Sequence, residues 1–420
     1  MPQDNPISET ITARCCLVGG GPAGMVCGFL LARAGIDVVV LEKHADFLRD
    51  FRGDTIHPST LELMFELGIL SEFLRRPHQE LTQIGAQVDD FTVAVADFSH
   101  LPTHCKFVGL MPQWEFLNFI TEKAKIYPRF HLRMETEVAD LLIENGKVAG
   151  VRAKSQNGAL EVRADLTIGA DGRRSIVREK AGLEVLDLGA PIDVLWMRVS
   201  RQAGDPNQAL GRFRAGKILV AIDRGEYWQC AYVIPKGGLD AIRQGGLASF
   251  QKEIASVAPF LRERLSELKD WNDVKLLSVA VDRLRKWWRT GLLCIGDSAH
   301  AMSPIGGVGI NLAIQDAVAA ANILAGPLAK GAVTDERLRE VQRRREFPTR
   351  VTQGFQVFAH KRFIGPAMRH ARPLTRLPLP LKLLQMFPIL RRIAARLVGL
   401  GVRPEHVRTP DTKQQTSRQG

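Results

Sequence analysis

One stretch of the sequence combines residue types that could hold a ligand: LLCIGDSAHAMSPIGGVGINLAIQDA, from Leu292 to Ala317. An apolar run ends at Asp297, and Gly306, Gly307 and Gly309 follow before a helical pattern begins. Glycine removes the side chain where a bulky group must approach the backbone, and a carboxylate accepts hydrogen bonds. The stretch therefore predicts a ligand held between the end of a buried strand and the start of a helix.

A second set of glycines lies near the N-terminus, in GGGPAGM. Gly19, Gly21 and Gly24 have the spacing GxGxxG, in which the first glycine permits a tight turn, the second admits a pyrophosphate and the third lets the helix approach the strand. Glu42 lies 23 residues beyond Gly19, where a carboxylate accepts a hydrogen bond from a ribose hydroxyl and repels a 2′-phosphate. This set predicts a bound dinucleotide.

A third stretch, ADLTIGADGRRSIVREKAGL, contains a buried strand that ends at Asp171 and Gly172. An NAD-binding domain needs neither this stretch nor the one around Asp297. FAD is longer, and its ribityl chain and isoalloxazine need support far from the first strand-to-helix turn. The two stretches therefore favour FAD, although Asp171 could also simply cap the helix that follows it.

The elements that must position these residues begin with a strand over 13–18, a helix over 23–34 and a strand over 36–41, which form a βαβ unit. Two strand-rich regions, 82–110 and 193–235 with 274–284, predict a sheet laid over the cofactor. We therefore expect an α/β fold: a Rossmann-like FAD-binding domain with an inserted β-sheet substrate domain and a helical C-terminal region. The expected ranges are 1–78, 112–182 and 285–330 for the FAD-binding domain, 79–111 and 183–284 for the substrate domain, and 331–420 for the basic C-terminal region.

The composition is that of a globular protein, with 420 residues, of which 45% are hydrophobic and 24% charged. No run reaches the roughly 18 apolar residues of a membrane-spanning helix, and the N-terminus lacks the pattern of a secretory signal. The six cysteines show no CxxC spacing and the ten histidines no HxxxH pairing. We expect a cytoplasmic protein with reduced thiols and no metal site.

The net charge of +12 is concentrated in the C-terminal region, because residues 337–420 contain 19 Lys and Arg but only 4 Asp and Glu. Nucleic acid is not the expected partner, since residues 366–407 offer Phe387 as their only aromatic ring and no binding module. Two interpretations stay open. In one, the leucines of this region pack on the FAD-binding domain and the arginines face solvent. In the other, the protein is peripheral at the inner face of the membrane, with Leu383, Leu384, Met386, Phe387, Ile389 and Leu390 at the bilayer interface and Arg391, Arg392 and Arg396 near anionic head groups.

The three motifs, in this order and at these separations over Ile11 to Leu324, resemble those of the group A flavoprotein aromatic monooxygenases, the para-hydroxybenzoate hydroxylase family. The resemblance implies that NAD(P)H reduces FAD and that O₂ adds to give a C4a-hydroperoxide. The distal oxygen is then transferred to an electron-rich carbon of a small aromatic or quinone-like substrate. It also implies that Asp297 holds the ribityl hydroxyls and that the helix begun by Gly306 to Asn311 points at the flavin pyrimidine ring, where its N-terminus stabilises negative charge on the reduced flavin.

The same resemblance assigns roles to further residues. Arg52, in RDFRGDTIHPSTLELMFELG, matches an arginine that lies along the cofactor, and Gln113 matches an early polar residue of a helix that touches it. The carbonyl of Pro304 would lie over the reactive flavin carbon. The expected catalytic residues are Pro304, Gly306, Gly307 and Arg52, and the expected cofactor-binding residues are Gly19, Gly21, Gly24, Glu42, Arg52, Gln113, Asp171, Gly172, Asp297, Gly309, Ile310 and Asn311.

The chain also departs from the family, because many relatives carry a second proline and a Gln or Lys where it has Ser303 and Val308. A flavin halogenase, a flavin-dependent reductase of isoprenoid substrates and a non-catalytic carrier of the same fold are the alternatives. A halogenase normally has Trp-x-Trp-x-Ile-Pro, a spacing that YWQCAYVIP lacks, and a carrier need not keep the flavin loop. We expect His300 to be a hydrogen-bonded scaffold residue, Tyr232 to pack in the core, and Trp287 and Trp288 to pack at an interface. The substrate-deprotonating base and the oligomeric state are left open.

Overall fold

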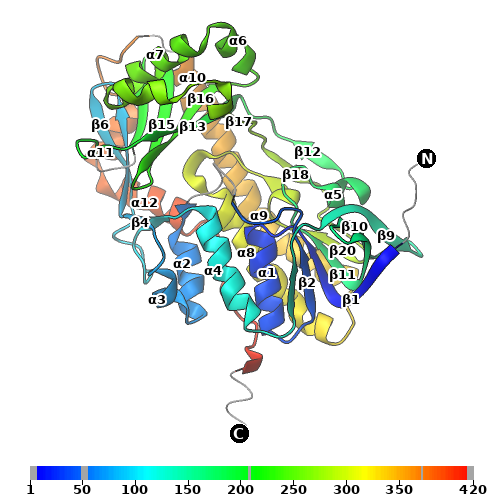
Figure 1. The fold of residues 1–420 in the computed structure, drawn as a ribbon. Coiled ribbons are helices and arrows are strands. Elements are labelled where there is room, and N and C mark those ends of the chain that lie inside the picture. Colours follow the sequence, from blue (N-terminus) through cyan, green and yellow to red (C-terminus); the bar gives the residue numbers. More distant parts are fainter. Residues whose placement is uncertain (1–6, 49–54, 207–209, 370–371, 414–420) are drawn as a thin grey trace.

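The structure is a computed structural model that describes residues 7–48, 55–206, 210–369 and 372–413. Its larger sheet has eight strands, in the order β19-β20-β11-β1-β2-β8, with β9 and β10 joined to β11 as an antiparallel extension (Figure 1). The strands are β1 (Ile7–Val18), β2 (Val38–Leu41), β8 (Phe130–Arg133), β9 (Glu137–Glu144), β10 (Lys147–Ser155), β11 (Gly158–Gly169), β19 (Trp288–Arg289) and β20 (Leu292–Cys294).

The central strands of this sheet are parallel, with Cys15 paired to both Val38 of β2 and Leu166 of β11. Strand β20 pairs with β11 in the same direction. Short runs of apolar, β-branched residues such as VVVL suit strands that are buried on both faces, and all four residues of β2 are buried. The carboxyl ends of β1, β2, β11 and β20 consequently meet at one edge of the sheet. All six cysteines are buried and none is bridged, as the sequence predicts.

The helices α1 (Pro22–Arg33), α4 (Gln113–Lys125) and α8 (Gly309–Ala329) cover one face of this sheet (Figure 1). Helix α9 (Asp335–Ala359) packs along α8. Helix α8 is long and apolar enough to cross a membrane, yet 72% of its most apolar stretch, within residues 305–329, is buried inside the molecule. It is the central core helix of the half that contains the larger sheet, and its two neighbours α1 and α9 fix where its N-terminus lies.

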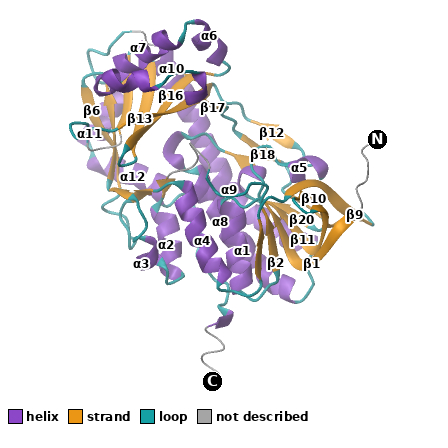
Figure 2. Ribbon diagram, viewed as in Figure 1, coloured by secondary structure: helices purple, strands orange, loops and turns teal. Residues whose placement is uncertain are grey.

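The second sheet lies in the upper part of the molecule, away from the first (Figure 2), and has seven strands in the order β17-β13-β16-β15-β14-β5-β6. One of its faces packs against α7 (Leu247–Val257), and Trp228, Cys230 and Tyr232 lie in that core as predicted. The hydroxyl of Tyr232 donates to Glu253 Oε2 at 2.9 Å. The strands are β5 (Gln83–Val88), β6 (Phe91–Asp97), β13 (Ile192–Ser200), β14 (Leu210–Arg214), β15 (Lys217–Asp223), β16 (Tyr227–Pro235) and β17 (Lys275–Leu277).

The strand-rich regions do not all join this sheet, contrary to the expectation from sequence. Residues 108–110 form β7, which pairs with β3 and β4, and residues 282–284 form β18, which pairs with β12 and β21. These two small sheets connect the large ones. The elements not yet named are β3 (Thr55–Ile56), β4 (Gln79–Leu81), β7 (Val108–Leu110), β12 (Val185–Asp187), β18 (Asp282–Leu284), β21 (His300–Ala301), α2 (Pro58–Glu66), α3 (Leu70–Phe73), α5 (Ile176–Lys180), α6 (Leu239–Gln244), η1 (Pro259–Glu267), η2 (Trp271–Asp273), η3 (Gly296–Ser298), η4 (Ile305–Gly307) and η5 (His360–Ile364).

The C-terminal region continues with α10 (Gly365–Arg369), α11 (Leu379–Met386) and α12 (Pro388–Gly399). The buried residues of α12 are Ala395 and Gly399, and Ala395 shares a small core with Phe98 and Leu101 just beyond β6. Gly399 is in close contact with the same two side chains. The buried face of α12 therefore packs against the strand region of the second sheet, while Leu397 and Leu400 line a cleft with residues of the expected FAD-binding domain, so the interpretation that placed the leucines on that domain holds in part.

Candidate functional site

The predicted site residues gather at the carboxyl edge of the larger sheet. Gly19 follows β1, Glu42 follows β2, Asp171 lies two residues beyond β11 and Asp297 three residues beyond β20. In open parallel sheets, ligands bind outside this edge. Motifs that are far apart in the sequence are thus brought together by the strand order alone.

The three fingerprint glycines are required for different reasons. Gly19 has φ +107°, and a Cβ there would lie 2.4 Å from the carbonyl oxygen of Ala170. A Cβ on Gly24 would lie 2.0 Å from the carbonyl oxygen of Gly19, so Gly24 allows α1 to approach β1. Gly21 has an ordinary φ of −74°, and a Cβ there would meet no atom within 4 Å. Among the residues that the structure describes, none demands glycine at position 21, whereas a diphosphate at the N-terminus of α1 would.

Glu42 is buried and anchors the loop that the fingerprint forms. Its Oε2 accepts a hydrogen bond from the Gly20 N–H at 2.9 Å, and its Oε1 accepts from the His44 N–H at 3.0 Å. The carboxylate therefore faces the start of α1, at the end of β2, where the ribose of a dinucleotide would lie. Its bond to the ribose stays a prediction.

Asp171 caps the helix that follows it and also offers an atom to a ligand. Its Oδ2 accepts from the Val177 N–H at 3.2 Å, so the capping role considered from the sequence is present. Its Oδ1 is buried without a hydrogen-bond partner, and so is Nη1 of Arg173. Burial raises the pKa of the Asp171 carboxyl. Buried polar atoms without partners are costly, and this donor and acceptor beside Gly172, whose φ is +84°, fit a polar ligand.

Asp297 is held in place by Arg173, whose Nε donates to its Oδ2 at 3.0 Å. About 31% of the Asp297 side chain is exposed, so it is available to ligand hydroxyls. The residue before it, Gly296, lies where α1 and α8 converge, because a Cβ there would lie 3.1 Å from the Cβ atoms of both Ala23 and Ala313. Asp297 is thus placed between the N-termini of the two helices.

The loop that precedes α8 is fixed by contacts with the segment around β3. Gly306 and Gly307 have φ values of 79° and 61°. Thr55 Oγ1 donates to the Gly307 carbonyl at 2.8 Å. The Asn311 side chain accepts from the His57 N–H at 2.8 Å and donates to the Thr55 carbonyl at 2.9 Å. The Asn311 side chain is therefore engaged within the protein, and it is the backbone at the start of α8 that is left to face a ligand.

Pro304 and two other predicted residues have the following places in the structure. The Pro304 carbonyl accepts from the Gly307 N–H at 3.0 Å, which closes the turn of the loop. Ile310 is buried in the first turn of α8. Gln113 is the first residue of α4 and is half-buried. Arg52 lies outside the described residues, three positions before Thr55. The contacts of all four with a cofactor stay predictions.

Residues of α9 and of the segment after it form hydrogen bonds with the same loop. These contacts could not be predicted from the sequence. Gln356 accepts from the Ser303 N–H at 3.1 Å and donates to the Ser303 carbonyl at 2.9 Å. The Nε2 of His360 lies 2.9 Å from Ser303 Oγ. Burial lowers the pKa of His360, because it disfavours the charged form of the ring. The backbone on either side of Pro304 is therefore held by the C-terminal region.

A buried ionic network links this region to the strand that ends at Gly296. Asp316, in α8, accepts from the Gly296 N–H at 3.1 Å and lies 2.5 Å from Nε2 of His300. Arg345 of α9 donates to Asp316 at 2.9 Å and lies 3.3 Å from Glu405. Despite complete burial, which acts to raise it, the pKa of Asp316 is held below its usual range by His300 and Arg345. His300 is confirmed as a scaffold residue, and Trp287 packs 5.0 Å from its ring.

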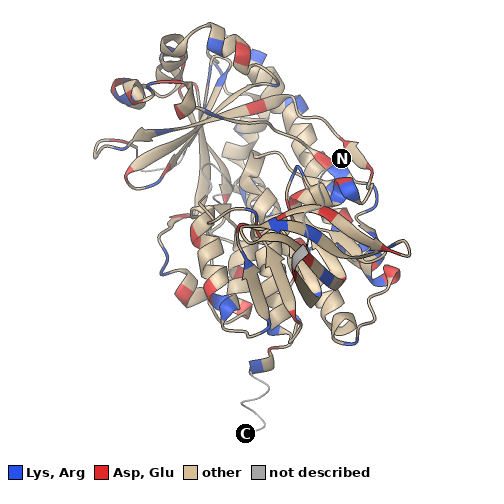
Figure 3. Cartoon of the chain, turned by 45° about the vertical axis from the view of Figure 1, so that its right-hand side comes forward, with Lys and Arg blue, Asp and Glu red and all other residues tan. Residues whose placement is uncertain are grey.

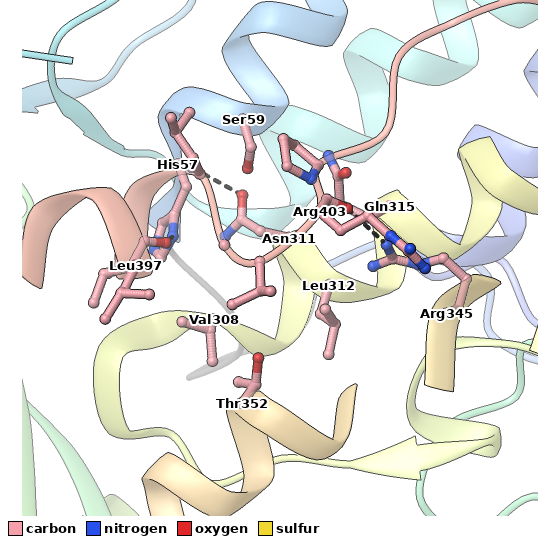
Figure 4. A pocket seen from close by; sticks show the side chains of 15 residues that line it. His57, Ser59, Val308, Asn311, Leu312, Gln315, Arg345, Thr352, Leu397 and Arg403 are labelled. Carbon is pink, nitrogen blue, oxygen red and sulfur yellow. Dashed lines mark hydrogen bonds between the residues drawn. The ribbon is translucent and has the colours of Figure 1, made fainter. Parts of the chain in front are cut away.

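A shallow cleft opens beside the start of α8 (Figure 4). Val308 just before α8, Leu312 of α8, Thr352 of α9 and Leu397 of α12 line it together with His57. The ring of His57 is bonded through Nδ1 to the Val398 carbonyl at 2.7 Å, and burial lowers its pKa to about 4. The wall of the cleft at Val308, Leu312 and Leu397 is thus apolar, and Arg345 and Arg403 line another part of the cleft.

Comparison with known proteins decides between the flavin-dependent alternatives. A family model described as an FAD binding domain matches residues 12–354. The chain is 34% identical, over 358 residues, to the 6-methylpretetramide 4-monooxygenase of Streptomyces rimosus, covering 83% of this chain and 84% of the relative. The chain belongs to the FAD-dependent aromatic monooxygenases. This monooxygenase is also 27% identical, over 332 residues, to a para-nitrophenol 4-monooxygenase of a Pseudomonas strain, covering 76% of this chain and 79% of the relative.

The fold of the monooxygenase is shared with solved structures. The anhydrotetracycline hydroxylase of Streptomyces rimosus superimposes with a TM-score of 0.71 at 21% identity, covering 94% of this chain and 77% of the hydroxylase. FAD is the cofactor of the monooxygenase. The residues present fit this cofactor, since the open position at Gly21 accommodates a diphosphate and the orphaned atoms of Asp171 and Arg173 offer it polar partners.

Proposed function

We propose that the monooxygenase uses NAD(P)H and O₂ to hydroxylate an electron-rich carbon of a fused-ring aromatic substrate. The single observation that carries the substrate class is the 34% identity, over most of both chains, to a relative named as a 6-methylpretetramide 4-monooxygenase. The apolar side chains of Val308 and Leu312 beside the loop support it, because ligand sites are lined mostly by apolar side chains. FAD, reduced by NAD(P)H, supplies the activation of dioxygen.

The residues of the chain position the cofactor and shield it. We propose that Asp297 and the free Oδ1 of Asp171 hold its hydroxyl-rich chain and that Glu42 accepts from its ribose. The first backbone N–H groups of α8 point the positive end of that helix at the ring, which stabilises negative charge there. The loop SPIGGVGINL, from Ser303 to Leu312, has no titratable side chain. Within this loop, the backbone carries the electrostatic stabilisation and the apolar side chains exclude water.

We also propose that the enzyme is a peripheral protein at the inner face of the membrane, which its basic C-terminal region contacts. The support is the charge of that region, which has 11 Lys and Arg and no Asp or Glu over residues 347–404. The exposed apolar residues of α11 and α12 add to it.

The hydroxylase proposal is tested by mixing the FAD-loaded protein with NADH or NADPH in the absence of oxygen, with and without fused-ring phenols. The expected result is that one donor bleaches the flavin absorbance and that a substrate phenol accelerates the bleaching. Admission of air should then give a hydroxylated product. A product that gains hydrogen without any need for air would instead identify a reductase and contradict the proposal.

A further inference from the structure

The outer surface of α12 is apolar, which is unusual for a helix on the outside of a protein. Ala395 and Gly399 face the second sheet. On the opposite side, Ile389, Ile393 and Leu397 follow one another at intervals of four residues, and 56%, 49% and 49% of these side chains are exposed. Residues four apart lie on one face of a helix. The side of α12 opposite its buried residues is therefore aliphatic where polar residues are expected.

Helix α9 presents a second exposed apolar stripe. Phe347, Val351, Phe355 and Phe358 recur at helical spacing and are all exposed. The two helices border the same cleft, since Thr352 of α9 and Leu397 of α12 both line it (Figure 4). We call these two stripes together, with the exposed residues of α11, the apolar rim: Phe347, Val351, Phe355, Phe358, Leu379, Leu383, Met386, Phe387, Ile389, Leu390, Ile393 and Leu397. An exposed patch of this kind marks an interaction site.

The segment over residues 347–404, which carries the apolar rim, has charges of one sign, and Asp97 of β6 is an acidic neighbour of Arg392. Arg392 and Arg396 flank Ile393 on the exposed side of α12, and Lys382 is exposed on α11. Over residues 347–404 the chain has 11 Lys and Arg and no acidic residue, whereas the rest of the chain has 46 basic and 45 acidic residues. Elsewhere, for example over the larger sheet, the two signs are interspersed (Figure 3). The surface beside the rim therefore complements an anionic partner.

We propose that α11, α12 and the exposed stripe of α9 dock on an anionic lipid bilayer, so that the cleft beside the flavin loop opens at the membrane. This inference rests on the proposed peripheral membrane contact and identifies the surface that makes it. Short amphipathic helices with aliphatic and aromatic side chains on one face and arginines at its borders lie in the interface of a bilayer. The arginine stems extend along the apolar layer and place the guanidinium groups at the lipid phosphates.

The alternative occupants match these observations less well. In a dimer formed through this surface, the basic regions of the two copies would face each other and repel each other. An acidic protein would complement the positive charge, but it would not explain why aliphatic side chains are exposed on α12. An anionic bilayer complements the positive charge and also buries the exposed aliphatic side chains. It also accounts for the position of the rim, because a lipophilic aromatic substrate could then pass from the membrane to Val308 without crossing water.

The test is co-sedimentation of the FAD-loaded full chain with vesicles of phosphatidylcholine alone and of phosphatidylcholine with phosphatidylglycerol, at low and high salt. We expect binding to the anionic vesicles at low salt, and weaker binding at high salt. The Arg392→Gln/Arg396→Gln variant should bind with a partition coefficient roughly 30-fold lower, since each basic residue at such a surface contributes about 1 kcal/mol. The matched control, Arg262→Gln/Lys269→Gln, removes two exposed cations from the substrate domain and should bind like the wild type.

A second pair of variants separates apolar insertion from charge. Ile389→Ser/Ile393→Ser should weaken binding by roughly tenfold or more, because two half-exposed isoleucines lose their burial in the bilayer. Its control, Ile126→Ser/Ile143→Ser, changes two equally exposed isoleucines elsewhere and should have no effect. The proposal is overturned if the wild-type protein stays in the supernatant with anionic vesicles at low salt. It is also overturned if a variant and its control lose vesicle binding to the same extent. A chain that forms a dimer dependent on Ile389 and Ile393 and binds no vesicles would assign the rim to a second copy.

The outcome is separable from that of the hydroxylase proposal. Flavin reduction and turnover of a water-soluble phenol are measured without vesicles, and the four variants should match the wild type in both. Vesicle binding without hydroxylation would leave the docking surface standing and refute the enzyme proposal. Hydroxylation without vesicle binding would support the enzyme proposal and refute the docking surface.

Discussion

Replacement of Gly21 by alanine should abolish tight FAD binding without unfolding the protein. The added Cβ meets no protein atom within 4 Å, and the backbone of Gly21, at φ −74° and ψ −178°, is open to any residue. Because alanine gives the unfolded chain less conformational entropy than glycine does, the substitution raises the free energy of unfolding by about 0.4–1 kcal/mol. Alanine is a poorer N-cap than glycine by a similar amount. The free energy of unfolding of the apoprotein should therefore change by less than about 1 kcal/mol.

The loss of affinity for FAD can be estimated from the backbone contacts that the Cβ prevents. A methyl group at position 21 keeps the diphosphate from the N-terminus of α1, and each hydrogen bond to a charged group contributes about 1.5–3 kcal/mol. Loss of one such bond weakens FAD binding roughly 10- to 150-fold. Titration of apoprotein with FAD, followed by quenching of flavin fluorescence, measures this change.

Gly24→Ala is the matched control, because its Cβ would overlap a backbone oxygen of the chain, the carbonyl of Gly19, at 2.0 Å. This variant should lose about 3 kcal/mol or more of folding stability whether or not FAD is present. Urea unfolding of both apoproteins compares the two positions. An FAD affinity of Gly21→Ala within twofold of the wild type would refute the placement of the diphosphate, and a normally stable Gly24→Ala would refute the packing of α1 on β1.

Two further predictions concern the flavin loop and its surroundings. Asp297→Ala removes an acceptor that Arg173 orients and should weaken FAD by about 1–3 kcal/mol; unchanged affinity in the same fluorescence titration would give Asp297 a purely structural role. Burial lowers the pKa of His57 from 6.5 to about 4, so the unfolded chain takes up the proton first as pH falls. The contribution of neutral His57 to the free energy of unfolding should be fully present above pH 6.5. It should decline by up to about 3 kcal/mol as pH falls to about 4. His57→Gln should lack that part of the decline in urea unfolding, and a variant that declines as steeply as the wild type would show that His57 is not the group responsible.

The carboxyl-edge site could be predicted from the sequence because it depends on local patterns. Each motif consists of an apolar strand followed by glycine or a carboxylate, and parallel strands bring such ends to one edge. Hence Gly19, Glu42, Asp171 and Asp297 could be expected together before any contact was known. The interior positions of Tyr232 and His300 followed from strand alternation and from family pattern.

Contacts between distant elements could not be predicted in the same way. The pairing of Arg345 with Asp316 and Glu405 depends on how α9 packs along α8, which no local pattern encodes. One signal was available, since Asp316 is a lone charge in the apolar helix INLAIQDA and a buried charge requires a partner. The clamp of Gln356 on Ser303 left no such signal, because a glutamine in a polar helix is ordinary. The packing of α12 was predicted only in part, because Ala395 and Gly399 contact the strand region of the second sheet in addition to the contacts of its leucines.

The most direct test of the account is the origin of the oxygen atom in the product. The FAD-loaded protein is supplied with NAD(P)H and a fused-ring phenol under isotopically heavy dioxygen in ordinary water, and the product is analysed by mass spectrometry. The account predicts one heavy oxygen atom in each molecule of hydroxylated product. A hydroxyl group that carries only ordinary oxygen from water, or a product changed without any oxygen gained, would contradict it.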